Sequence, residues 1–132
     1  MKLQGKIVFV TGASAGIGAA TALAFAAEGA KLLLAARRVE KLAEIADEAR
    51  KSGAQDVHTF ALDVRDNGAV EAAIAALPEE WKAIEVLVNN AGLSRGLEKV
   101  YEGKVSDWDE MIDTNVKGLL YVTRAEIGRA HV

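Results

Sequence analysis

The chain has 132 residues, of which 51% are hydrophobic and 27% charged, and its formal net charge is −3. This length and apolar content favour one folded domain with a buried core and argue against disorder. The acidic balance, without a long basic run, argues against nucleic acid as the main partner. The chain holds no cysteine, which excludes disulfides and thiolate metal sites, so we expect a cytoplasmic protein with no metal centre.

Apolar runs alternate with helical patterns along the chain, and turn residues separate them. Continuous apolar runs predict strands that are buried on both faces. Gly29 and Gly53 are expected to end the first two helices, Asp66 to cap the third at its N-terminus and Ser106 to cap a fourth. In chain order, the predicted elements are strand 6–11, helix 16–28, strand 31–36, helix 39–51, strand 57–62, helix 67–77, strand 85–88 and a helix from 106 onward.

The alternation of strands and helices predicts the α/β class, because parallel strands pair through right-handed helical crossovers. The predicted architecture is therefore a doubly wound parallel sheet. No linker or shift in composition divides the chain, and no apolar run is long enough to span a membrane. The longest segment without periodicity, 92–105, follows the carboxyl end of the fourth strand, where ligands bind in open α/β sheets.

The segment 11–18, TGASAGIG, joins the first strand to the first helix. A strand, a glycine turn and a helix together present backbone N–H groups and a helix N-terminus to a phosphate. We expect Gly12 to permit the sharp turn and Gly16 to let a pyrophosphate approach the backbone. Gly18 would then allow the helix to pack closely against the strand.

Three further segments accompany this turn: Leu62-Asp63-Val64, Asn89-Asn90-Ala91-Gly92, and Asn115 within DTNVKG. Their order and intervals resemble those of the short-chain dehydrogenase/reductase family. The resemblance extends to about Ala125 and implies the first half of a Rossmann-type sheet, with strand order 3-2-1-4. Residues 1–125 would form the dinucleotide-binding portion of a single domain. We expect 126–132 to be a non-native tail, since EIGRAHV departs from the family and matches one reading frame of a DNA sequencing adapter.

The resemblance also implies roles for individual residues. Asp63 would accept a hydrogen bond from the exocyclic amine of adenine, and Asn115 would be the catalytic asparagine, which holds a water in a proton relay. Taken singly, Asp63 could be a strand-end turn residue, the Asn89-Asn90 pair a plain turn, and Asn115 a tolerated polar residue. The residues implied to contact the dinucleotide are Gly12, Ser14, Gly16, Ile17, Gly18, Asp63, Val64, Asn90, Ala91 and Gly92.

The end of the second strand predicts which nicotinamide cofactor binds. In this fold an acidic side chain there hydrogen-bonds the ribose 2′-hydroxyl of NAD. Here Ala36 occupies that position and Arg37 and Arg38 follow it. A guanidinium pairs with the 2′-phosphate of NADP, so we predict NADP(H), with Arg37 as the first choice and Arg38 as the second. Alternatively, the two arginines only begin a solvated helix. The sequence also departs from many NADP-using relatives at Ala15, where they carry a basic residue.

The resemblance implies an NADP-dependent oxidoreductase that transfers a hydride between nicotinamide and a secondary alcohol or ketone. Several scaffold segments look closest to the 3-hydroxy acid dehydrogenases. The alternatives are a 3-oxoacyl-carrier-protein reductase and a non-catalytic dinucleotide-binding module. The implied partners are a small-molecule alcohol or carbonyl substrate and, for the parent protein, three further copies in a homotetramer; neither nucleic acid nor a membrane is expected.

The family's catalytic serine and Tyr-x-x-x-Lys pair have no counterpart in this sequence. Tyr101 is followed four residues later by Val105, and Tyr121 by Ala125. A proton donor to the substrate oxygen and its activating lysine are both needed for the reaction. We therefore expect the 132-residue chain to be inactive by itself.

Overall fold

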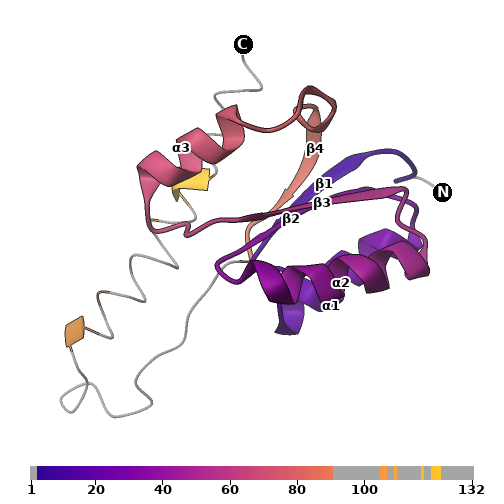
Figure 1. The fold of residues 1–132 in the computed structure, drawn as a ribbon, viewed down its shortest axis with the longest axis horizontal. Coiled ribbons are helices and arrows are strands. Elements are labelled where there is room, and N and C mark those ends of the chain that lie inside the picture. The colour runs from indigo at the N-terminus through magenta and orange to yellow at the C-terminus, as the bar shows by residue number, and fades with distance from the viewer. Residues whose placement is uncertain (1–2, 91–104, 107–108, 110–116, 118–119, 123–132) are drawn as a thin grey trace.

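A computed structural model describes residues 3–90, 105–106, 109, 117 and 120–122. Four parallel strands form one sheet with the order β3-β2-β1-β4, as the family resemblance implied (Figure 1). Parallel neighbours need crossover connections, which the helices between the strands provide. The elements are β1 (Ile7–Thr11), α1 (Gly16–Ala27), β2 (Lys31–Ala36), α2 (Val39–Ser52), β3 (Asp56–Ala61), α3 (Asn67–Ala75), η1 (Glu79–Trp81) and β4 (Ile84–Val88).

Helices cover both faces of the sheet, with α1 and α2 on one side and α3 on the other (Figure 1). Successive side chains of a strand point to opposite faces, so both faces need apolar residues. Val8 and Leu34 are buried in the cluster on the α1 and α2 side, whereas Phe9 and Leu33 are buried in the cluster that includes α3. This two-sided burial is the physical reason for the continuous apolar runs of β1 and β2.

The helix α1 is apolar around its whole circumference and is made largely of alanine. Its buried positions include Ala22 and Ala26, which belong to the same cluster as Leu42 of α2. Small side chains let α1 approach both the sheet and α2 closely. The amphipathic α2 ends at Gly53, whose φ of 120° fits the expected glycine stop.

The element boundaries differ slightly from those expected. The helix α3 ends at Ala75 rather than at 77, and the short 3-10 helix η1, which the sequence analysis did not include, follows Pro78. It places Trp81 in the cluster under α3 with 5% of its surface exposed. The cap at Asp66 is confirmed, because its carboxylate accepts a hydrogen bond from the backbone N–H of Ala69 at 3.1 Å.

One predicted cap is wrong. Val105 and Ser106 are both helical, so Ser106 lies inside the helix and not at the position that precedes it. The described residues include no helix both long and apolar enough to cross a membrane.

Candidate functional site

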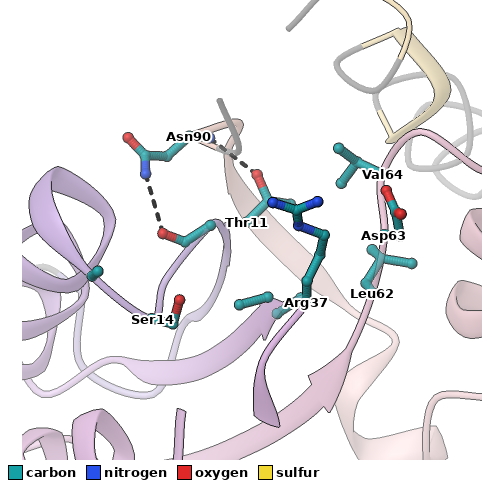
Figure 2. A pocket seen from close by; sticks show the side chains of 11 residues that line it. Thr11, Ser14, Arg37, Leu62, Asp63, Val64 and Asn90 are labelled. Atoms are coloured by element: carbon teal, nitrogen blue, oxygen red, sulfur yellow. Dashed lines mark hydrogen bonds between the residues drawn. The ribbon is translucent and has the colours of Figure 1, made fainter. Parts of the chain in front are cut away.

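A pocket of about 250 Å³ opens where the four strands end (Figure 2). Parallel strands bring their carboxyl ends to one edge of the sheet, which gathers residues that are far apart in the chain. Each strand is followed by residues that contribute to this pocket. The lining residues are Thr11, Gly12, Ser14, Ala15, Ala35, Ala36, Arg37, Leu62, Asp63, Val64 and Asn90.

The turn between β1 and α1 depends on its three glycines. Gly12 and Gly16 have φ angles of 63° and 58°, which only glycine adopts without strain. A Cβ added to Gly18 would collide with the Gly12 carbonyl oxygen and lie 2.5 Å from Asn90 Nδ2. A Cβ added to Gly16 would meet nothing within 4 Å. Gly18 thus serves internal packing, whereas Gly16 leaves open space beside the backbone.

Hydrogen bonds hold this turn against the end of β4. The Thr11 hydroxyl donates to the Val88 carbonyl at 3.4 Å and accepts from the Asn90 backbone N–H at 3.0 Å. The Asn90 side-chain amide donates to the Gly12 carbonyl at 3.3 Å. Figure 2 shows Asn90 beside Thr11 at the rim of the pocket. The carbonyl of the first glycine is therefore fixed by a residue 78 positions later.

The N-terminus of α1 offers unpaired donors to the same region. Ala15 occupies the capping position in extended backbone and supplies no side-chain acceptor, and the first turn holds no acidic residue. The first N–H groups of a helix lack partners within the helix and carry a partial positive charge. This end of α1 is thus electrostatically suited to an anion.

The end of β2 supplies a cation. Ala36 is buried, and the exposed Arg37 that follows it extends over the pocket (Figure 2). Arg38 begins α2 as its capping residue and is not among the lining residues. Of the two arginines, Arg37 is the one placed to meet a ligand in this pocket.

The one acidic lining residue, Asp63, is paired with Arg65. The Arg65 Nη2 lies 2.7 Å from Asp63 Oδ2, and its Nε lies 2.9 Å from Oδ1. Hydrogen bonds from the Arg65 side chain hold the pKa of the Asp63 carboxyl below its usual 3.8, partial burial opposes this, and the charge of Arg37 lowers it slightly further. Asp63 is therefore an ionised acceptor at neutral pH.

The structure brings together six of the predicted site residues and leaves others apart. Gly16, Ile17, Gly18 and Arg38 do not line the pocket, although Ile17 lies in the adjacent first turn of α1 with 77% of its surface exposed. Ala91, Gly92 and Asn115 lie outside the described residues. The residues that do line it are Gly12, Ser14, Arg37, Asp63, Val64 and Asn90.

Sequence reasoning assigned no site role to Thr11, although its hydroxyl links β1 and β4. It also assigned no role to Arg65, although this residue lies only two positions after Asp63 and could have been recognised as a partner for it. No group of three or more histidine or acidic side chains that could hold a metal ion occurs among the residues described.

Comparison with known proteins identifies a matching family and several similar proteins. A model of the family described as short chain dehydrogenase matches residues 6–128. The NADP-dependent 3-hydroxy acid dehydrogenase YdfG of Salmonella typhi is 46% identical over 132 aligned positions, which cover 96% of this chain and 52% of that protein. The sulfoacetaldehyde reductase of Chromohalobacter salexigens is 48% identical over 118 positions, covering 89% of this chain and 46% of the relative.

Among solved structures, the closed form of serine dehydrogenase complexed with NADP+ superimposes with a TM-score of 0.85 at 46% identity. The match covers 93% of this chain and 48% of that one. The chain thus spans about half the length of the curated relatives and the solved structure that it matches.

Proposed function

The chain belongs to the short-chain dehydrogenase family, and from this premise we propose that its strand-end pocket binds NADP(H) for hydride transfer to or from a small alcohol or carbonyl compound. The observation that carries the proposal is the placement of Arg37 at the pocket, directly after a strand that ends in alanine. A carboxylate at the end of this strand would instead suit the free ribose hydroxyls of NAD.

The residues present fit the dinucleotide. The glycine turn leaves space beside Gly16 where a side chain would stand, and the uncapped end of α1 faces an anion favourably. Arg37 would pair with the 2′-phosphate, while Ser14 and Gly12 would lie along the pyrophosphate and ribose. Asp63 and Val64 would flank the adenine, with the carboxylate accepting from its amine. When bound, the nicotinamide supplies the centre that accepts or donates the hydride.

The similar proteins support this cofactor in their own names. One relative is named as NADP-dependent, and the serine dehydrogenase structure was solved with NADP+. We propose a 3-hydroxy acid as the substrate class on the same basis. The sulfoacetaldehyde reductase matches at nearly equal identity, so a different small carbonyl compound is the main competitor.

We also retain Asn115 as the candidate catalytic asparagine. Within these 132 residues, neither tyrosine is followed four positions later by lysine. These residues therefore lack the family's Tyr-x-x-x-Lys pair for protonating the substrate oxygen, and we expect them alone to bind cofactor without turnover. Turnover of a 3-hydroxy acid by the 132-residue chain would contradict this expectation and would also exclude a role as a non-catalytic dinucleotide-binding module.

The cofactor assignment is tested by the substitution Arg37→Ala. Loss of one charge-assisted phosphate contact should weaken NADPH binding by roughly 10- to 100-fold and NADH binding by less than about threefold. Both affinities are measured by isothermal titration. The matched control is Arg50→Ala, which removes an arginine of α2 that pairs with Asp47 and donates to the Val57 carbonyl, away from the pocket lining. If affinity for NADPH fell no more than affinity for NADH, the assignment would be wrong.

A further inference from the structure

Among the described residues, Asp63 and Arg65 form a tighter ion pair than three others do. Arg65 donates to Asp63 Oδ1 from its backbone N–H at 3.0 Å and from Nε at 2.9 Å. It donates to Oδ2 from Nη2 at 2.7 Å and, over a longer 3.2 Å, from Nε. The pairs Arg50–Asp47, Lys82–Glu79 and Lys6–Glu85 are separated by 3.2, 3.4 and 4.0 Å.

The two residues have different positions relative to the pocket. Asp63 lines it and Arg65 does not, so the contact of Arg65 with Asp63 is a route by which it can act on a ligand there. Both side chains are about one-third exposed, at 38% for the aspartate and 31% for the arginine. The planar guanidinium fork, together with the backbone N–H, fixes the plane of the carboxylate. Asp63 cannot rotate freely while these bonds persist.

The pairing also leaves the carboxylate able to accept another hydrogen bond. An ionised carboxylate offers about four lone-pair sites. Oδ1 already has two close donors, whereas Oδ2 has one close donor and one distant one. Oδ2 therefore retains capacity for a further donor. Because the group stays ionised, it accepts hydrogen bonds and cannot donate them.

We propose that Arg65 is a positioning residue that holds Asp63 as a fixed acceptor, through which the pocket selects a 6-amino purine over a 6-oxo purine. This inference rests on the proposed function, because it concerns the adenine end of the proposed dinucleotide. An exocyclic amine donates to a fixed carboxylate oxygen. A carbonyl at the same position would place two acceptors against each other, which is unfavourable.

The test compares NADP+ with its hypoxanthine analogue, in which a carbonyl replaces the 6-amino group. The native protein should bind NADP+ about tenfold more tightly than the analogue, since one hydrogen bond to a charged group is at stake. The variant Arg65→Gln should reduce this ratio to below about threefold, mainly by weakening NADP+. The matched control Arg50→Gln breaks a surface arginine–aspartate pair on α2 and should keep the native ratio.

Two further variants separate positioning from general stability. Arg65→Lys keeps the charge but lacks the fork, so we expect an intermediate ratio. Asp63→Asn should lose the discrimination, and adding Arg65→Gln to it should change the ratio no further, because the arginine acts through that carboxylate. A melting temperature for each variant identifies any that fail to fold, in which case the lysine variant carries the test.

The outcomes distinguish this inference from the function on which it rests. If the native protein bound neither nucleotide, the proposed function would fail and the inference with it. If the native protein bound NADP+ but Arg65→Gln or Arg65→Lys kept the full native ratio, only the role of Arg65 would be overturned. The role of Arg65 would also be overturned if Arg65→Gln lowered the ratio of NADP+ affinity to analogue affinity by the same factor in the native protein and in the Asp63→Asn variant.

Discussion

The substitution Gly18→Ala tests the packing of the glycine turn directly. An added Cβ would lie 2.8 Å from the Gly12 carbonyl carbon and 2.5 Å from Asn90 Nδ2, with the Gly12 carbonyl oxygen closer still. Two of these three atoms belong to the backbone. The Asn90 amide also holds that carbonyl through a 3.3 Å hydrogen bond. The methyl group can therefore be accommodated only if the turn or α1 moves.

The expected cost combines three effects. Overpacking against a rigid neighbour destabilises by about 1–3 kcal/mol, and loss of the Asn90 hydrogen bond adds about 1 kcal/mol. Alanine recovers roughly 0.5–1 kcal/mol over glycine within a helix. We expect a net loss of about 1–3.5 kcal/mol. With an unfolding entropy of about 2.1 cal/mol/K per residue, this corresponds to a fall of roughly 4–13 °C in melting temperature.

Thermal unfolding followed by circular dichroism provides the assay. Gly68→Ala in α3 is the matched control, because its added Cβ would meet only Asp66 Oδ1 at 3.4 Å. It should stabilise the protein by about 0.5 kcal/mol. Gly16→Ala meets no atom within 4 Å but has a φ of 58°, so it should cost about 1–2 kcal/mol through backbone strain alone. If the Gly18→Ala variant had the same melting temperature as the native protein, the packing argument would be refuted.

Three further predictions concern the scaffold and the site. Leu34→Ala empties a fully buried position on β2 and should cost about 3 kcal/mol, measured by urea unfolding. Asp66→Ala removes the cap of α3 and should cost about 1 kcal/mol by the same measurement. The lowered pKa of Asp63 means that any stability it gains from Arg65 is fully present above its usual 3.8 and is lost as pH falls through the lower folded value. The difference in unfolding free energy between native protein and Asp63→Asn should thus stay constant from about pH 7 to 5 and shrink as the pH falls below 3.8.

The scaffold was largely readable from local sequence pattern, since buried strands and capped helices leave local signals. The bounds of β2 are those predicted, and β1 and β3 differ by one residue at their ends. The strand order came from the family resemblance, because no local pattern specifies which parallel strands pair. The helix η1 was missed since three residues after a proline show no periodicity, and its role depends on burying Trp81 under α3.

Site residues could be predicted from the sequence only where a single residue type at a defined position indicates its role. The glycines of the turn and Arg37 were identified from their spacing from a predicted strand. The contacts of Thr11 and Asn90 span 79 positions and need the β1–β4 pairing before they can be inferred. The Arg65 fork depends on a side-chain conformation in the loop after β3, which the sequence does not specify. Arg38, the second choice for the 2′-phosphate ligand, is the capping residue before α2 and does not line the pocket.

The pairing of Asp63 also bears on how one pocket can recognise two chemically opposed parts of the proposed cofactor. A lone carboxylate beside a phosphate site would repel the phosphate and attract Arg37 away from it. Arg65 compensates the charge of Asp63 at 2.7 Å without lining the pocket itself. Arg37 then remains the uncompensated charge of this group, while Asp63 is still an acceptor for a neutral donor. The proposed acceptor for adenine and the proposed cation for the 2′-phosphate would be compatible in one small pocket because each negative charge would have its own guanidinium.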